Sequence, residues 1–222
     1  MPSKITASNI ADYIHVIHDT QHEFDVVENA LSKIYNDGQG AGATLLSKIT
    51  SNCSGARGVF INLCSESFTI PVLTGPQLEE YGIEHNIPND PTTDRHNKAA
   101  KTLSEKDENG NRSEGTHAVI AWRPEDYIDV STRGRPCLRD DSNYGFITLA
   151  HELVHAYRKV KGNATGSRIC EEKRAVGLGQ FSGSSFSENA IRREHGLPIR
   201  NRYQTLEDPD CDESPESGSD YY

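Results

Sequence analysis

The 222-residue sequence predicts a single domain of the α+β class with a small, mostly antiparallel sheet. Short runs rich in β-branched and aromatic residues, bounded by turn residues, recur up to position 122 and indicate strands. Apolar residues follow helical spacing over 22–36 and again over 145–160. Beyond residue 145 every predicted element is a helix, so helices dominate the end of the domain.

In the first half of the chain we expect a strand at 13–17, helices over 22–36 and 43–49, and strands at 58–64 and 67–73. The last two strands are close enough in sequence to form a hairpin. The apolar stripe of the first helix consists of Phe24, Val27, Leu31 and Ile34.

The second half begins with a polar stretch, 84–115, which we expect to form a long surface loop. Residues 118–122 are the clearest strand, and 131–143 a second loop. The predicted helices then cover 145–160, 169–178 and 188–195. Ser187 is the expected N-cap of the last helix.

Three regions are predicted along the chain: a flexible segment at 1–12, a domain over 13–205, and an acidic disordered tail at 206–222. The tail carries seven acidic and no basic residues, so the remainder of the chain has a charge of only about −3 out of −10. A chain of this sign is not expected to bind nucleic acid.

No apolar stretch is long enough to span a membrane, and the N-terminus has no secretory signal pattern. The five cysteines are scattered without a CxxC pair, which indicates neither a disulfide framework nor a cysteine zinc site. We therefore expect the protein to act in a cytosol, and nothing in the sequence suggests assembly beyond a monomer.

The most informative motif is His151-Glu152-Leu153-Val154-His155, an HExxH sequence within an apolar run. Histidines four residues apart on a helix lie on the same face, where both can bind one zinc ion. The adjacent Glu152 is then placed to act as a general base. The alternative is that the two histidines are ordinary residues on the polar side of a buried helix.

A catalytic zinc needs a third protein ligand. Glu171 and Glu172 are the best placed, because the chain has room to fold the next helix back against the HExxH helix. Less well placed candidates are Glu188, Glu194 and His195. Glu188 is instead a candidate hydrogen-bond partner that orients one of the ligand histidines.

Residues 171–177 (EEKRAVG) resemble the EExxxxG segment of the clostridial neurotoxin light chains. The resemblance assigns the third ligand to Glu172 and leaves Glu171 as a surface or helix-start charge. Those light chains also carry an Arg-x-x-Tyr pair that contacts the substrate carbonyl, which corresponds here to Arg200 and Tyr203. Arg202 or Arg193 are the alternatives to Arg200.

A closer resemblance covers about residues 15–205. The segments HELVHAYR, EEKRAVG, SENAIRREHGLPIRNRY and EFDVVENALSKI are similar to the NleD-type type III effectors, zinc metallopeptidases with plant-pathogen relatives of the HopH/XopG kind. The resemblance implies a zincin-like fold with an HExxH active-site helix. It also implies secretion through a type III system into the host cell cytoplasm, and a host protein substrate, possibly a MAP kinase.

Together these observations predict a zinc-dependent endopeptidase with one Zn²⁺ per chain, held by His151, His155 and Glu172. Glu152 is the expected general base, and Arg200 and Tyr203 are expected to stabilise the oxyanion. Strand 118–122 is a candidate edge for binding substrate, or else a central strand.

Two other functions remain open at this point. One is a zinc hydrolase that acts on a non-peptide amide. The other is a non-catalytic, zinc-stabilised effector that binds a host protein. The loop with Arg133 and Arg135 is a further candidate contact for an acidic or phosphorylated substrate, or simply a solvated loop.

Overall fold

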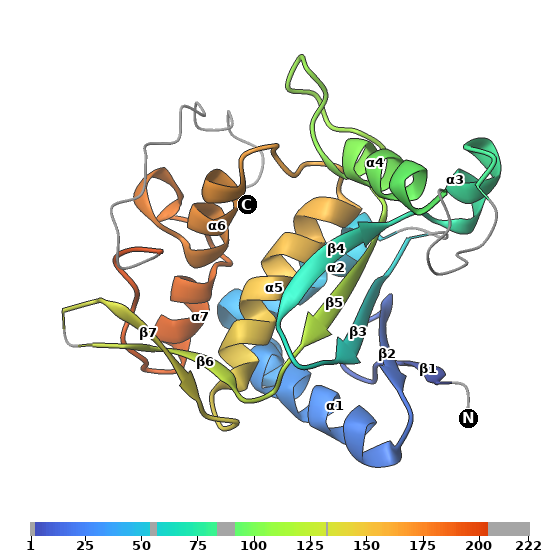
Figure 1. Cartoon of the computed structure of the whole chain (residues 1–222). Helices are drawn as coiled ribbons and strands as arrows, with labels where there is room; N and C mark the ends of the chain where they lie inside the picture. The colour runs from blue at the N-terminus through green and yellow to red at the C-terminus, as the bar shows by residue number, and fades with distance from the viewer. Residues whose placement is uncertain (1–2, 54–56, 84–91, 132, 204–222) are drawn as a thin grey trace.

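The computed structural model describes residues 3–53, 57–83, 92–131 and 133–203 (Figure 1). The main sheet has five strands in the order β1 (Lys4–Ala7), β2 (Ile14–His18), β3 (Val59–Leu63), β5 (His117–Trp122) and β4 (Phe68–Val72). The pairings β2–β3 and β3–β5 are parallel, whereas β1–β2 and β4–β5 are antiparallel. The α+β class is confirmed, and the sheet is mixed.

The expected hairpin between the strands at 58–64 and 67–73 is wrong, because β5 lies between them. The burial of the strands explains this order. Val59 and Ile61 of β3 and Ala118 and Ile120 of β5 are fully buried, whereas Phe68 and Ile70 of β4 are 44% and 45% exposed. The two apolar strands therefore take the centre of the sheet, and β4 becomes its edge.

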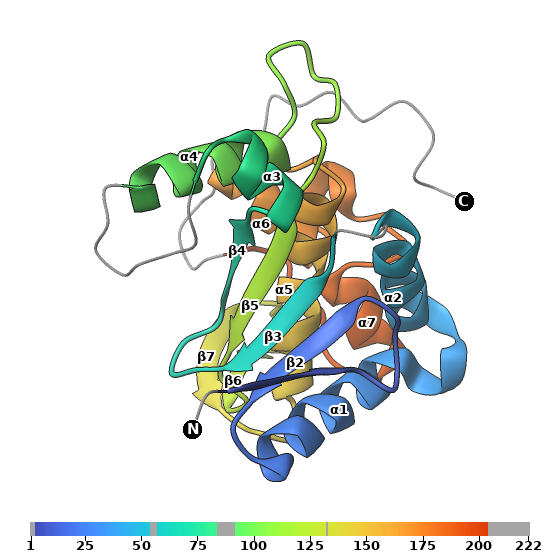
Figure 2. The same cartoon turned by 90° about the vertical axis from the view of Figure 1, so that its right-hand side faces the viewer.

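Helices α1 (Gln21–Tyr35), α2 (Gly40–Asn52) and α5 (Gly145–Val160) share one hydrophobic core with the sheet (Figure 2). Alternate side chains of β2, β3 and β5 belong to this core, whereas Phe60 and Val119 on the opposite face are only half-buried. Thr20 begins α1 with a capping box that includes Glu23. All three helices were predicted, although α2 is longer than expected.

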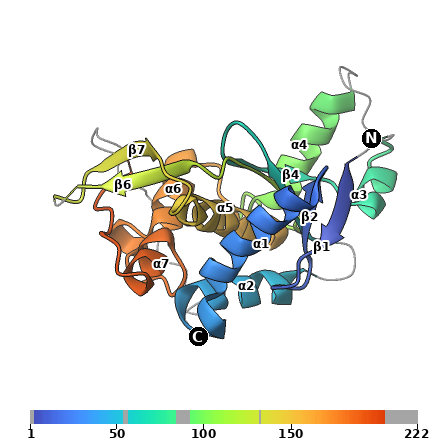
Figure 3. The same cartoon turned by 90° about the horizontal axis from the view of Figure 1, so that it is seen from below.

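Helix α5 lies between the main sheet and a second group of elements (Figure 3). This group consists of α6 (Arg168–Val176), α7 (Glu188–Glu194) and the antiparallel pair β6 (Asp126–Val130) and β7 (Pro136–Asp140). Short 3-10 turns occur at η1 (Asn36–Gly38) and η2 (Gly179–Phe181). The helices α5, α6 and α7 and the N-cap Ser187 agree with the sequence prediction. Because α5 has neighbours on both sides, it is apolar around most of its circumference.

Two helices and three strands, β1, β6 and β7, were not predicted. Helices α3 (Gly75–Glu80) and α4 (Thr92–Ser104) form near the polar stretch, of which 84–91 lie outside the described residues. Strand β7 occupies part of the expected loop 131–143, and β1 lies within the segment expected to be flexible. All four residues of β1 are exposed, as are four of the five in β7, so no hydrophobic alternation marks them.

The predicted acidic tail, 206–222, also lies outside the described residues. Within the described ranges, no helix is both long and apolar enough to cross a membrane. Cys53, Cys64 and Cys137 have free thiols, whereas Cys170 is disulfide-bonded, a bond that the scattered cysteines did not predict.

Candidate metal centre

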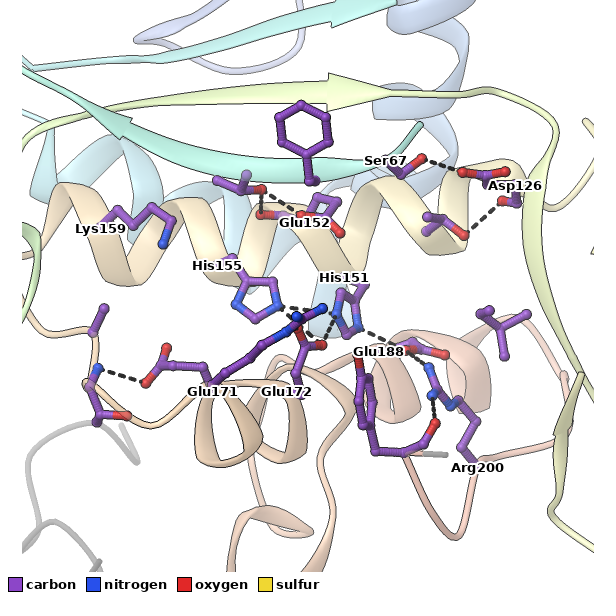
Figure 4. Close-up of a pocket in the computed structure, with 18 of the residues that line it drawn as sticks. Ser67, Asp126, His151, Glu152, His155, Lys159, Glu171, Glu172, Glu188 and Arg200 are labelled. Atoms are coloured by element: carbon purple, nitrogen blue, oxygen red, sulfur yellow. Dashed lines mark hydrogen bonds and ion pairs between the residues drawn. The ribbon is translucent and has the colours of Figure 1, made fainter. Parts of the chain in front are cut away.

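Helix α5 presents His151, Glu152 and His155 to a single cleft (Figure 4). The opposite side of the helix is anchored in the core by its predicted apolar stripe, whose members are at most 5% exposed: Phe146, Leu149, Leu153, Tyr157 and Val160. This anchoring sets the rotation of the helix, so both imidazoles point away from the core. The Nε2 atoms of His151 and His155 lie 3.1 Å apart.

Glu172 completes the cluster from the first half of α6. Its Oε2 atom lies 3.1 Å from Nε2 of His151 and 3.6 Å from Nε2 of His155. In the described part of the chain, these three residues form the one group of His, Cys, Asp and Glu side chains that could hold a metal ion. Helix α6 begins at the N-cap Ser167 after a tight connection, and this connection turns it back against α5.

The geometry of the three donor atoms fits zinc. Ligand atoms about 2.0–2.1 Å from a tetrahedral metal lie roughly 3.4 Å from one another. The three separations, between 3.1 and 3.6 Å, match that value. Two imidazole nitrogens and one carboxylate are also a donor set that catalytic zinc sites use.

Glu188, at the start of α7, fixes the orientation of His151. Its Oε2 atom accepts a hydrogen bond from Nδ1 of His151 at 3.0 Å, which leaves Nε2 directed towards the cluster. Glu188 is itself held by Arg192, whose Nε lies 2.8 Å away, and by Arg200, whose guanidinium lies 2.9 Å away. Glu188 is 1% exposed, so burial and three hydrogen bonds hold its side chain in a single conformation.

The charges around His151 are strongly coupled. Burial opposes its protonation, but hydrogen bonds to Glu172 and Glu188 outweigh burial and raise the pKa of His151 to about 10. Burial likewise opposes ionisation of Glu172 and Glu188. The neighbouring imidazoles nevertheless hold the pKa of the Glu172 carboxyl far below its usual range. Arg200 and His151 do the same for the carboxyl of Glu188. In the metal-free chain a proton on His151 thus compensates the neighbouring carboxylates, and a divalent cation bound there would take the place of that proton.

Glu152 lies on the sheet side of the cleft. The hydroxyl of Thr69, in the edge strand β4, donates to Oε2 of Glu152 at 2.6 Å and lies 3.1 Å from the Glu152 carbonyl oxygen. This contact joins the carboxylate to the strand that borders the cleft. Sequence reasoning missed Thr69, because a threonine 83 residues away carries no spacing signal.

Arg200 and Tyr203 line the same cleft, as the Arg-x-x-Tyr pattern predicts. Arg200 is 4% exposed and donates to Glu188 and to the backbone carbonyl of Tyr203. Its guanidinium also lies 5.6 Å from the centre of the Tyr203 ring. Arg200 is therefore joined both to the partner of His151 and to the residue expected to donate to the oxyanion.

Glu171 differs from the expected surface charge. It stands in the first turn of α6 as predicted, but it is 8% exposed and paired with Arg158 of α5. The Nε atom of Arg158 lies 2.8 Å from one carboxylate oxygen and 3.1 Å from the other. Glu171 also accepts a hydrogen bond from the backbone of Thr165. This buried ion pair joins the first turn of α6 to α5 and stabilises their packing.

The cleft has a volume of about 640 Å³ and extends in both directions from the cluster. Phe68, Ile128, Leu138 and Tyr203 line it along with Arg200, and so do charged residues from α4, α5 and the start of α6. It is large enough to accommodate a segment of a peptide.

The family model Peptidase_M91, described as "Effector protein", matches residues 15–203. The chain belongs to this family. The similarity to the NleD-type effector peptidases is thereby confirmed, and the chain is an effector-family peptidase.

No curated protein matches the chain. Among solved structures, the light chain of botulinum neurotoxin type G aligns with 68% of this chain and with 44% of its own length, at 13% sequence identity and a TM-score of 0.34. This chain thus matches less than half of that light chain.

The other candidate ligands of this effector-family chain, Glu194 and His195, lie outside the metal cluster. Glu194 accepts hydrogen bonds from the first turn of α2, and His195 packs on the ring of Phe146. Strand β5 is paired on both sides, so of the two alternatives for 118–122 the central strand is confirmed and the substrate-binding edge is wrong. Neither Arg133 nor Arg135 is among the described residues that line the cleft.

Proposed function

We propose that this chain is a zinc-dependent endopeptidase, secreted through a type III system, that cleaves a host signalling protein in the host cell cytoplasm. The observation that carries the proposal is the convergence of two Nε2 atoms and one carboxylate oxygen at zinc-ligand spacing, with Glu152 beside them in an open cleft. Family membership supports the peptidase and effector parts. A MAP kinase substrate is implied by resemblance to the NleD-type effectors.

His151, His155 and Glu172 would hold one zinc ion per chain. When bound, zinc supplies Lewis-acid chemistry: it polarises the scissile carbonyl and makes a water molecule more acidic. Glu188 keeps Nδ1 of His151 occupied, so the Nε2 lone pair stays available to the metal. Arg192 and Arg200 keep Glu188 ionised for that role.

Glu152 is the general base in this proposal. Its carboxylate takes a proton from the attacking water and delivers it to the amine that leaves. Thr69 fixes the rotamer of Glu152, and it sits on the edge strand against which the substrate is expected to lie. Because no other described carboxylate shares this position, replacing Glu152 leaves the reaction without a base.

Arg200 and Tyr203 are proposed to stabilise the oxyanion that develops on the scissile carbonyl. Arg200 also holds Glu188 and the backbone of Tyr203, so it positions the segment that carries the phenol. A substitution at Arg200 is therefore expected to reduce both zinc affinity and turnover.

Strand β4 is the proposed edge for an extended substrate, in place of β5. It is paired on one side only, it borders the cleft at Phe68 and Thr69, and each of its side chains is exposed or only partly buried. An extended peptide binds such an edge through main-chain hydrogen bonds. Pro71 removes one donor within the strand, so pairing would be confined to the part near Thr69.

The test begins with zinc content, measured by elemental analysis on the wild type, His155→Ala and Glu172→Ala. We expect one zinc per wild-type chain and a loss or strong reduction in both variants. Glu171→Gln is the matched control, since Glu171 is adjacent in sequence but bonded to Arg158. A folded wild type that binds no zinc would overturn the proposal.

Peptidase function is tested by adding wild type and Glu152→Ala to host cell lysate and comparing protein termini by mass spectrometry. New termini with wild type alone support proteolysis. If host-protein binding persists and no termini appear with either chain, the chain is a non-catalytic binding effector instead.

A further inference from the structure

Lys159 extends the row of His151 and His155 by one more helical turn. The three residues are spaced by four positions on α5, so they share one face of the helix. All three line the same cleft, and Figure 4 shows the Lys159 side chain directed from α5 into it, on the side where Glu171 lies. The proposed peptidase mechanism gives this residue no role.

The ammonium group of Lys159 lacks a direct partner. Among the residues that the structure describes, it makes no hydrogen bond or ion pair, although it is partly buried. The other lysine in this helix turn, Lys161, donates to the hydroxyl of Tyr157 at 2.8 Å. A lysine in a half-buried position normally acquires such a partner or reaches solvent.

Carboxylates do occur near Lys159, but each is bonded elsewhere. Glu171 is paired with Arg158 and with the backbone of Thr165. Glu152 is bonded to Thr69, and Glu105 lies 4.0 Å from Lys101. Burial lowers the pKa of the Lys159 ammonium despite these charges. The positive charge is thus incompletely compensated, which favours the entry of an anion.

Besides Arg200, two further cationic side chains line the same cleft. Lys101 reaches it from α4, and Arg168 from the first turn of α6. Their side chains are 66% and 86% exposed, so they can move towards a ligand. In contrast, Phe68, Ile128 and Leu138 line the cleft with apolar side chains.

Building on the peptidase function proposed above, we infer that Lys159, assisted by Lys101 and Arg168, forms a subsite for an anionic side chain of the substrate. The chemistry recognised is a carboxylate or phosphate oxygen that takes the direct contact missing at Lys159. Lys159 is thus a specificity-determining residue and takes no part in the proton transfers.

The position on α5 also places this subsite relative to the bond that is cut. Lys159 lies one turn from His155 and two from His151, about 6–12 Å along the helix axis. An extended peptide advances about 3.3 Å per residue. The anionic residue is therefore expected about two to four positions from the scissile bond.

The test uses a synthetic library of random peptides with blocked ends and the full-length, zinc-loaded chain. Cleaved products of the wild type and peptides retained by Glu152→Gln are both sequenced by mass spectrometry, each with and without Lys159→Met. We expect acidic residues to be enriched two to four positions from the cut, and the enrichment to disappear with Lys159→Met.

Matched peptides then isolate the charge. With Glu replaced by Gln at the enriched position, wild-type kcat/KM should fall on the order of tenfold or more, while Lys159→Met should show little difference. Lys159→Arg should keep the preference. Lys98→Met is the control, because Lys98 is an exposed lysine of α4 that does not line the cleft. A phosphoserine peptide cleaved better than the Glu peptide would identify phosphate as the preferred source of the anion.

The two proposals fail in different ways. Cleavage that shows no preference for acidic residues, or a preference that survives Lys159→Met, overturns the subsite and leaves the peptidase intact. A zinc-loaded chain that neither cleaves nor retains any peptide contradicts the peptidase function, and the subsite with it.

Discussion

The surroundings of Glu188 and of Lys159 in the cleft differ in how far a buried charge is paired. Around Glu188, every charged group has a direct partner: the carboxylate bonds to His151, Arg192 and Arg200. Around Lys159, the ammonium has no direct bond to any described residue. A fully paired network is rigid and suits the holding of a metal ligand, whereas an uncompensated charge suits the binding of something that comes from outside. The comparison therefore separates preorganised machinery from a place for substrate.

The largest effect on turnover is expected at Glu152, which lies in the cleft between these two regions. Glu152→Gln keeps the size of the side chain and can still bond to Thr69, but it cannot accept a proton. Turnover should fall by about 10²–10⁴-fold, with zinc content and thermal stability close to wild type. Peptide cleavage and elemental analysis on one preparation check this. Activity within a few-fold of wild type would show that another group acts as the base.

Removing the central carboxylate of the paired region should destabilise the folded protein. Glu188→Ala leaves the buried Arg192 and Arg200 without their counter-charge and should lower the free energy of unfolding by about 3–5 kcal/mol. It should also weaken zinc binding about 10–100-fold, because His151 loses its orienting partner. Urea unfolding and zinc titration measure the two effects. Glu188→Gln is the milder companion, and unchanged zinc affinity in both variants would refute the orienting role.

Glu171 and Glu172 offer a sharper version of the comparison, because they are adjacent in sequence. Glu171→Gln removes the buried partner of Arg158 and should destabilise the fold by about 3 kcal/mol, yet leave one zinc per chain. Glu172→Gln should abolish tight zinc binding with a smaller loss of stability in the metal-free chain. Zinc content and urea unfolding of the two variants measure these effects. The reversed pattern would make Glu171 the zinc ligand and Glu172 the structural residue.

The smallest effect on stability is expected at Lys159. Lys159→Met removes a partly desolvated charge that has no direct partner, so the free energy of unfolding should stay within about 0.5 kcal/mol of wild type or rise slightly. Urea unfolding measures it. Loss of more than about 2 kcal/mol would mean that the ammonium is already paired in the folded protein, and the contrast with Glu188 would disappear.

The sequence predicted best where one helix carries the information. The stripe of α5 and the HExxH spacing placed three residues of the centre, because a helix fixes the relative directions of side chains three and four positions apart. Helix α1 was found by the same periodicity, and α7 by its N-cap Ser187. The assignment of Glu172 came from resemblance; periodicity alone left Glu171 equally suitable.

Elements without an apolar pattern were missed. Helix α4 buries few apolar side chains and strand β7 is largely exposed, so neither shows the periodicity on which prediction depends. The order of the strands was missed too, because β3 and β4 are close in sequence and yet separated by β5. Because that order places β4 at the edge of the sheet beside the cleft, Thr69 can bond to Glu152.

The sequence by itself determined that a His-Glu-His face would exist on a buried helix, and the α+β class around it. Only the tertiary structure decided which glutamate meets the histidines, which strand borders them, and which lysine of the cleft makes no direct bond to another described side chain. The reason is physical. Periodicity and spacing act within one element, over a few residues, whereas these three outcomes depend on contacts between α5, α6, α7 and β4, whose relative positions are set by packing.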